Sequence, residues 1–248
     1  MLKILLVICY IAFFIFLPLY DKAYWPEPTK KSLTCKMCAA TLFIAIAVLG
    51  IFISGNRSDY VTYMLIGLCL GWLGDLLMHI PHGDREPYMG AVYTGAGGFL
   101  IGHIFYVCAF AVTTASLVKD YSFITVPEVI AFAVIYLVFA LMLEPVFKFR
   151  FTGRFMKIAL YIYSVFLVIM LVKSVGFGIT YYIHGSENNL IAGAILVVGG
   201  ILFFISDFTL GLRLLGGKKG DKFIKTLSLY TYFLAQLLLS TSILFVKA

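Results

Sequence analysis

Long apolar runs recur along the whole chain, and their length is the first indication of its fold class. A helix that crosses the hydrocarbon core of a bilayer needs about 20 mostly apolar residues. Eight such runs occur, at residues 2–19, 37–54, 60–80, 90–117, 127–147, 157–178, 189–214 and 224–246. A closed β-barrel would show short alternating segments instead. The pattern therefore predicts an all-α polytopic membrane protein with eight transmembrane helices.

The composition leaves no room for a separate soluble domain. Of the 248 residues, 62% are hydrophobic and only 12% are charged, whereas about a quarter of a soluble domain is charged. We therefore expect residues 1–248 to form a single integral membrane domain. The formal net charge is +7, and basic residues at helix ends are explained by attraction to anionic lipid headgroups. We expect membrane lipids, and no nucleic acid, as partners.

The distribution of lysine and arginine predicts an orientation. When the runs are threaded alternately, 14 basic residues fall on one side and five on the other. The positive-inside rule makes the first side cytoplasmic and places both termini outside. The first run ends in Pro18-Leu19-Tyr20, which is not a small-residue cleavage site, so we expect a retained helix rather than a signal peptide. The absence of appended domains favours a bacterial inner membrane, with the endoplasmic reticulum as the alternative.

The third and seventh runs share a pattern around an acidic residue. Gly67 precedes Asp75 by eight residues, and Gly199 precedes Asp207 by eight residues. In both runs a small residue stands directly before the aspartate. The similarity suggests an internal duplication, with chance similarity among glycine-rich apolar helices as the alternative.

The runs that follow also correspond. An aromatic, two apolar residues and a small residue precede His103, which lies 28 residues after the first aspartate, and Gln236, which lies 29 after the second. Residues 1–125 and 126–248 would then form a parallel four-plus-four repeat around an axis along the membrane normal. Such an axis would place the two aspartates at the same depth.

Two acids inside apolar runs need an explanation. An ionised carboxylate at the centre of a bilayer costs about 2.5–3.5 kcal/mol on insertion scales. By helix rise, Asp75 and Asp207 lie roughly 8–10 Å inside the cytoplasmic boundary. A buried acid can serve as a structural hydrogen-bond acceptor, but two acids at matched depth favour a function. The glycines near them could allow close helix packing or leave room for a ligand.

The histidines and cysteines do not form a recognisable metal motif. His79 and His82 flank Pro81 at a helix end, so they cannot form the i, i+4 pair of a helical zinc site. Cys35 and Cys38 form one C-x-x-C without a second pair, and a zinc site needs about four ligands. We expect no metal and no cofactor, with convergence of His79, His82, His103 and an aspartate on a metal as the alternative.

Several segments resemble one family of membrane proteins. The matching segments are Gly74-Asp75-Leu76-Leu77, Phe99-x-x-Gly102-His103-x-x-Tyr106, residues 163–170, residues 200–210 with Ser206-Asp207, and Tyr232-x-x-Ala235-Gln236-x-Leu238. Together they resemble the YhhN/TMEM86 family of membrane lysoplasmalogenases over the whole chain. One departure occurs at Lys31-Ser32-Leu33, where the family tends to have Lys-Pro-Leu at the entry to the second span.

The resemblance implies an ether hydrolase whose substrate is a lysophospholipid. Such an enzyme cleaves the vinyl-ether bond of a lysoplasmalogen to a fatty aldehyde and glycerophosphocholine or glycerophosphoethanolamine. The chemistry needs an acid to protonate the β-carbon and a group to direct water, comparable to the paired carboxyls of glycosidases. Burial and a second nearby carboxylate both favour the protonated form of a carboxyl. We expect Asp75 and Asp207 to form this acid–base pair, without an assignment of which is the acid.

The other expected site residues would orient water or bind the lysolipid. His103 and Gln236 would orient water or an acid, and the phosphate would lie near Lys31 and Arg213. The remaining residues that we expect to bind or orient the substrate are Ser206, Tyr106, Tyr163 and Tyr232.

A transporter is the alternative function. A proton- or cation-coupled carrier of small molecules or lipids could use the same aspartates, and parallel repeats occur in transporters. The sequence lacks a pair of proline- or glycine-broken half-helices of the kind that many transporters have.

Overall fold

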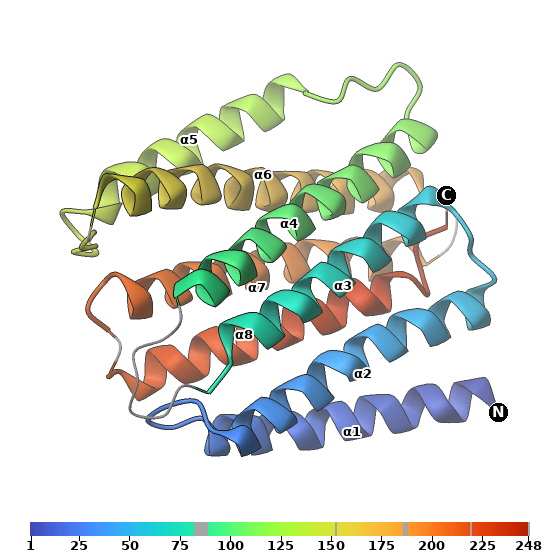
Figure 1. Ribbon diagram of the computed structural model, residues 1–248. Helices are drawn as coiled ribbons and strands as arrows, with labels where there is room; N and C mark the ends of the chain where they lie inside the picture. Colours follow the sequence, from blue (N-terminus) through green and yellow to red (C-terminus); the bar gives the residue numbers. More distant parts are fainter. Residues whose placement is uncertain (82–88, 152, 186–187, 219, 248) are drawn as a thin grey trace.

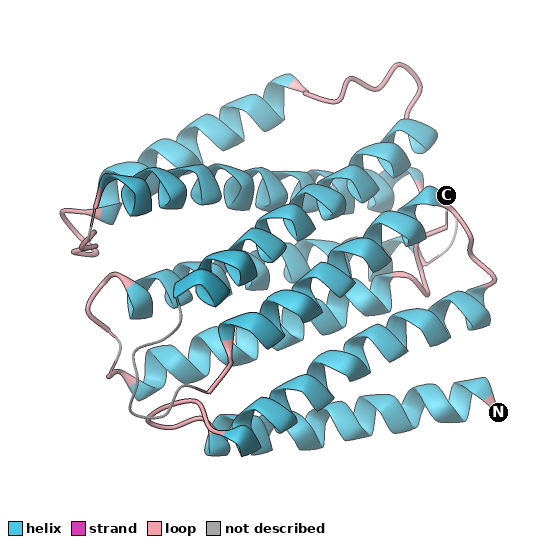
Figure 2. Ribbon diagram, viewed as in Figure 1, coloured by secondary structure: helices cyan, strands magenta, loops and turns pink. Residues whose placement is uncertain are grey.

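A computed structural model describes all residues except 82–88, 152, 186–187, 219 and 248. The described residues form helices and loops without strands (Figure 2). The helices are α1 (Leu2–Ala23), α2 (Lys30–Ser54), α3 (Asp59–Met78), α4 (Met89–Leu117), α5 (Val126–Leu143), α6 (Arg154–His184), α7 (Asn189–Leu214) and α8 (Lys222–Ser242). All eight are long and apolar enough to cross a membrane, which confirms the predicted fold class.

The helices run alternately in opposite directions. Both ends of the described chain lie at one end of the bundle, and the last residues of α1, α3, α5 and α7 lie at the other (Figure 1). We call this second end the basic end, because it carries most of the lysine and arginine residues. Its assignment to the cytoplasm stays a prediction.

Six helices form a closed ring around the interior. Neighbours pack in the order α2, α3, α4, α6, α7, α8 and back to α2. Outside the ring, α1 packs against α2 and α8, and α5 packs against α6. The neighbour order within the ring is unchanged when each helix is exchanged for the one four places along the chain. A four-plus-four repeat predicts this order, and the repeat itself stays a prediction.

The start of α2 lies seven residues earlier than the sequence indicated. Thr29 and Ser32 form a capping box, in which each side chain accepts a hydrogen bond from the other residue's backbone N–H. The box begins the helix at Lys30, so Lys36 lies inside the span and is buried. The sequence-based boundary at residue 37 was wrong because it treated this lysine as a flanking charge. Helix α2 ends at Ser54, and the C-cap residue Gly55 takes the left-handed conformation with φ +69°.

The glycines of α3 make room for side chains of other helices. A Cβ atom at Gly67 would overlap the Tyr106 ring of α4, and one at Gly71 would lie 2.8 Å from Gln236 Nε2 of α8. Helices with small residues at their interface approach closely. These two glycines therefore serve the packing of polar side chains against α3.

Candidate active site

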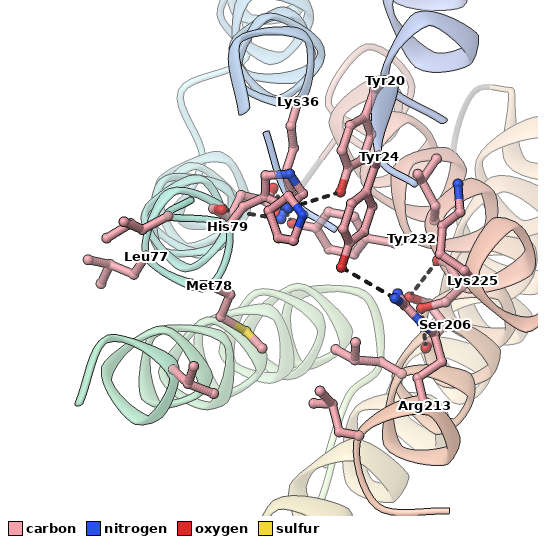
Figure 3. A pocket seen from close by; sticks show the side chains of 18 of the residues that line it. Tyr20, Tyr24, Lys36, Leu77, Met78, His79, Ser206, Arg213, Lys225 and Tyr232 are labelled. Atoms are coloured by element: carbon pink, nitrogen blue, oxygen red, sulfur yellow. Dashed lines mark hydrogen bonds and ion pairs between the residues drawn. The ribbon is translucent and has the colours of Figure 1, made fainter. Parts of the chain in front are cut away.

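A cavity of about 500 Å³ opens inside the basic end, and both buried acids line it. One wall carries polar side chains from α1, α2, α7 and α8, several of which appear in Figure 3. The lining also includes apolar side chains, namely Leu77, Met78, Ala91, Val92, Leu210 and Leu214. The structure therefore brings Asp75 and Asp207 to one amphipathic space.

Asp75 is buried, and donors from two other helices occupy both of its carboxylate oxygens. The Lys36 ammonium of α2 lies 3.0 Å from Oδ1 and also donates to the Asp75 carbonyl oxygen at 3.2 Å. The Tyr232 hydroxyl of α8 donates to Oδ2 at 2.7 Å. A carboxylate held by a cation and a hydroxyl is stabilised in its ionised form.

A chain of hydrogen bonds extends behind Tyr232. Gln236 Nε2 donates to the Tyr232 hydroxyl oxygen at 3.2 Å, and the Tyr106 hydroxyl donates to Gln236 Oε1 at 2.9 Å. Neither Gln236 nor Tyr106 lines the cavity. Their position suits the orientation of Tyr232 rather than contact with a ligand.

Asp207 has different partners. The Tyr163 hydroxyl of α6 donates to Oδ2 at 2.5 Å. The His103 Nε2 atom of α4 lies 3.7 Å from the same oxygen, which is too long for a hydrogen bond. Both ring nitrogens of His103 are buried without a hydrogen-bond partner. Within the described residues, no lysine or arginine forms an ion pair with Asp207.

The remaining predicted residues are divided between the cavity and its surroundings. Arg213 and Ser206 line the cavity. The Ser206 hydroxyl donates to the Ser228 carbonyl oxygen at 3.1 Å and thereby joins α7 to α8. Lys31 is exposed and does not line the cavity; its role in phosphate binding stays a prediction.

Lys36 is the main residue of the site that the sequence analysis missed. It was counted only among the basic residues at a helix end. The signal was available, because a lysine that continues into an apolar run is a functional hypothesis by default. Tyr20 and Tyr24 were also missed, since nothing in the first run shows that its end packs over the cavity.

His79, at the end of α3, contacts two side chains through its ring. Its Nε2 lies 2.8 Å from the Ser32 hydroxyl oxygen and its Nδ1 lies 3.4 Å from that of Tyr20. Burial lowers the pKa of His79 to about 2, and the positive charges of Lys36 and Arg213 lower it further. The imidazole therefore stays neutral at the wall of the cavity.

The residues once considered for a metal do not converge in the described part of the chain. No group of three or more histidine, cysteine, aspartate or glutamate side chains there could hold a metal ion. His82 lies outside the described residues. Cys35 and Cys38 are free thiols on α2, the first buried and the second half-buried.

Comparison with sequence models of known families gives a match for this chain. The sequence model of the YhhN family matches residues 31–243, which is most of the chain. The chain belongs to the YhhN family. No curated protein and no solved structure matches it. The part of this YhhN-family chain that matches contains both acids and Lys36, whereas α1, which supplies Tyr20, lies before it.

Proposed function

We propose that this chain is a lysoplasmalogenase, an ether hydrolase that releases a fatty aldehyde and glycerophosphocholine or glycerophosphoethanolamine from a lysoplasmalogen. The observation that carries the proposal is the shared cavity, where two buried carboxyl groups meet unlike partners. Vinyl-ether hydrolysis needs a protonated acid for carbon and a base for water. Two carboxyls in unlike surroundings can divide such roles.

The partners of each acid support an assignment. Asp75 is the carboxylate, because Lys36 balances its charge and both of its oxygens accept from donors. Asp207 is the neutral acid, because burial without a cation disfavours a charged carboxyl. Its Oδ2 accepts from Tyr163, which leaves Oδ1 to carry the proton.

The proton transfers balance over a full turnover. Asp207 gives its proton to the β-carbon of the vinyl ether, which forms an oxocarbenium ion beside the new carboxylate. Water adds to the α-carbon and gives a proton to Asp75, which yields a neutral hemiacetal. As the hemiacetal collapses, Asp75 protonates the departing glycerol oxygen and Asp207 takes the hemiacetal hydroxyl proton. Both acids return to their starting states.

The interior beyond the acids favours an enzyme over a transporter. A transported solute needs a path from the basic end to the end with the termini. The space in that direction contains the buried side chains of Tyr106, Gln236 and Tyr60, and none of them lines the cavity. A cavity whose described lining does not reach these side chains suits a lipid that binds, reacts and leaves by the basic end.

The test is aldehyde release by purified protein in detergent, where no gradient exists. We expect wild type to convert a lysoplasmalogen to equal amounts of aldehyde and glycerophosphodiester. Asp75→Asn and Asp207→Asn should each lower turnover by about 10³-fold, within the range for removal of a general acid or base.

The matched control is Asp59→Asn, at the exposed opposite end of α3, which should keep wild-type turnover. Near wild-type turnover in either folded active-site variant would overturn the assignment. Solute flux that depends on a gradient, without any aldehyde release, would instead establish a transporter.

A further inference from the structure

Among the described residues, three cations line the cavity, and two of them have a carboxylate partner. Lys36 pairs with Asp75 at 3.0 Å, and Lys225 pairs with Asp21 at 2.6 Å. Arg213 forms no ion pair in the described part of the chain. The guanidinium of Arg213 is therefore a charge in the cavity that no carboxylate of the described residues balances.

The surroundings of Arg213 leave several of its donors available. One Nη2 hydrogen is donated to the Tyr24 hydroxyl at 3.3 Å, and the guanidinium lies 5.3 Å from the centre of the same ring. Its Nε is buried without a hydrogen-bond partner. A guanidinium has five N–H donors, and a buried donor without an acceptor is destabilising. Figure 3 shows Arg213 and Tyr24 together at the polar side of the cavity.

We propose that Arg213 and Tyr24 form the subsite for the phosphate of a lysophospholipid. The inference rests on the proposed function and deepens it by identifying the group that the substrate presents to Arg213. A phosphodiester supplies the negative charge and the acceptor oxygens that the guanidinium lacks, and arginine binds phosphate through paired N–H donors. Tyr24 holds the guanidinium in place through its hydroxyl and its ring.

The spacing along α7 fits a substrate that reaches both groups. Arg213 follows Asp207 by six residues, which is about 9 Å along a helix. In an extended lysoplasmalogen, seven covalent bonds join the β-carbon to phosphorus, a span of roughly 9 Å from ordinary bond lengths and angles. Arg213 is the nearer of the two to the basic end, so the phosphate would face the membrane surface. Glu27, which also lines the cavity, is exposed and forms no ion pair with Arg213 in the described residues.

Ligand binding tests the subsite without the hydrolytic reaction. The ligands are a lysophosphoethanolamine with a saturated ether chain, which has no vinyl ether, and the alkylglycerol of the same chain length. The protein has two tryptophans, so Trp72→Phe leaves Trp25, beside Lys225 at the polar side of the cavity, as a fluorescent reporter. We expect wild type in neutral detergent to prefer the phospholipid. Arg213→Gln should lower this preference about 10- to 100-fold, as expected for lost hydrogen bonds to a charged group.

Two controls keep the outcome clear. Arg150→Gln, an exposed arginine at the same end, should keep the wild-type preference. If Arg213→Gln does not fold, glycerophosphoethanolamine is tested as a competitor on the wild-type protein, where the proposal expects displacement of the phospholipid. An unchanged preference in folded Arg213→Gln, or a lack of competition in wild type, overturns the subsite. If binding of the ether lipid depends on Arg213 but the protein releases no aldehyde from a lysoplasmalogen, the proposed hydrolase is rejected and the subsite is kept.

Discussion

Asp75 and Asp207 occupy matching places in the ring of helices but have partners of different charge. Asp75 on α3 is contacted from α2 and α8, and Asp207 on α7 is approached from α6 and α4. These pairs of helices exchange when each helix is replaced by the one four places along the chain. In one place α2 supplies the Lys36 ammonium, whereas in the other α6 supplies the Tyr163 hydroxyl.

Under the proposed function, this difference would let two acids in matching places of the ring hold opposite protonation states. Both carboxyls are buried in the same cavity, so burial alone cannot separate them. Lys36 distinguishes the two acids, because its ammonium balances a negative charge at Asp75. Among the described residues, no lysine or arginine pairs with Asp207. Substitutions that remove one part of this difference at a time should therefore differ in their effects on turnover and on stability.

The largest effect is expected on turnover in Asp207→Asn. The account assigns a neutral acid to this position, and asparagine is neutral and of the same shape but has no acidic proton. The rate of aldehyde release should fall about 10³-fold, while thermal unfolding in detergent stays within a few degrees of wild type. A large loss of stability in this variant would show that the position carries a charge.

The next effect is expected on stability in Asp75→Asn. This substitution leaves the Lys36 ammonium buried without a counter-charge, and breaking a buried ion pair by removing one partner costs about 3–5 kcal/mol. Thermal unfolding should occur well below that of Asp207→Asn. Adding Lys36→Met should restore most of the stability and none of the activity. Equal stability of the two asparagine variants would remove the distinction between the acids.

A smaller contrast is expected between the two tyrosines that donate to the acids. Tyr163→Phe removes the hydroxyl that donates to Asp207 and would stabilise this carboxyl after it loses its proton, so kcat should fall about 10-fold. Tyr232→Phe leaves the Lys36 ion pair on Asp75 in place, so kcat should fall only about 3-fold. Steady-state aldehyde release measures both, and the reverse order would contradict the assignment.

The smallest effect is expected at Lys31. Its side chain is exposed and lies outside the cavity, and a surface substitution of this kind changes free energies by about 0.5 kcal/mol or less. Lys31→Gln should change kcat/KM less than about 2-fold, whereas Lys36→Gln should nearly abolish activity. A strong loss in Lys31→Gln would restore the sequence-based expectation that this lysine binds phosphate.

The helices and the two acids were predictable because their signals are local in the sequence. An apolar run of sufficient length spans a membrane, and an aspartate within such a run can be read directly. The pairing of Lys36 with Asp75 could not be predicted, since it depends on how α2 packs against α3. The boundary of α2 was misplaced for the same reason: a lysine can lie inside a span when a carboxylate from another helix meets it.

The surroundings of His103 and Gln236 differ, and this difference could not be predicted from the sequence. The two residues occupy matching positions after the two acids, and the sequence analysis expected similar roles for them. Gln236 is hydrogen-bonded to two tyrosines, whereas His103 has no hydrogen-bond partner for either ring nitrogen. The partners come from neighbouring helices, so the pattern along one run did not contain them.

Hydrolysis in D₂O is the sharpest test of Asp207 as the acid, because the proposed acid delivers its proton to carbon. We expect the wild-type protein to turn over more slowly in D₂O and to release an aldehyde with one deuterium at its second carbon. Asp207→Asn should lose this reaction, and Asp59→Asn should keep it with the same isotope effect. Aldehyde without deuterium at that carbon, or undiminished deuterium-labelled product from folded Asp207→Asn, would contradict the account.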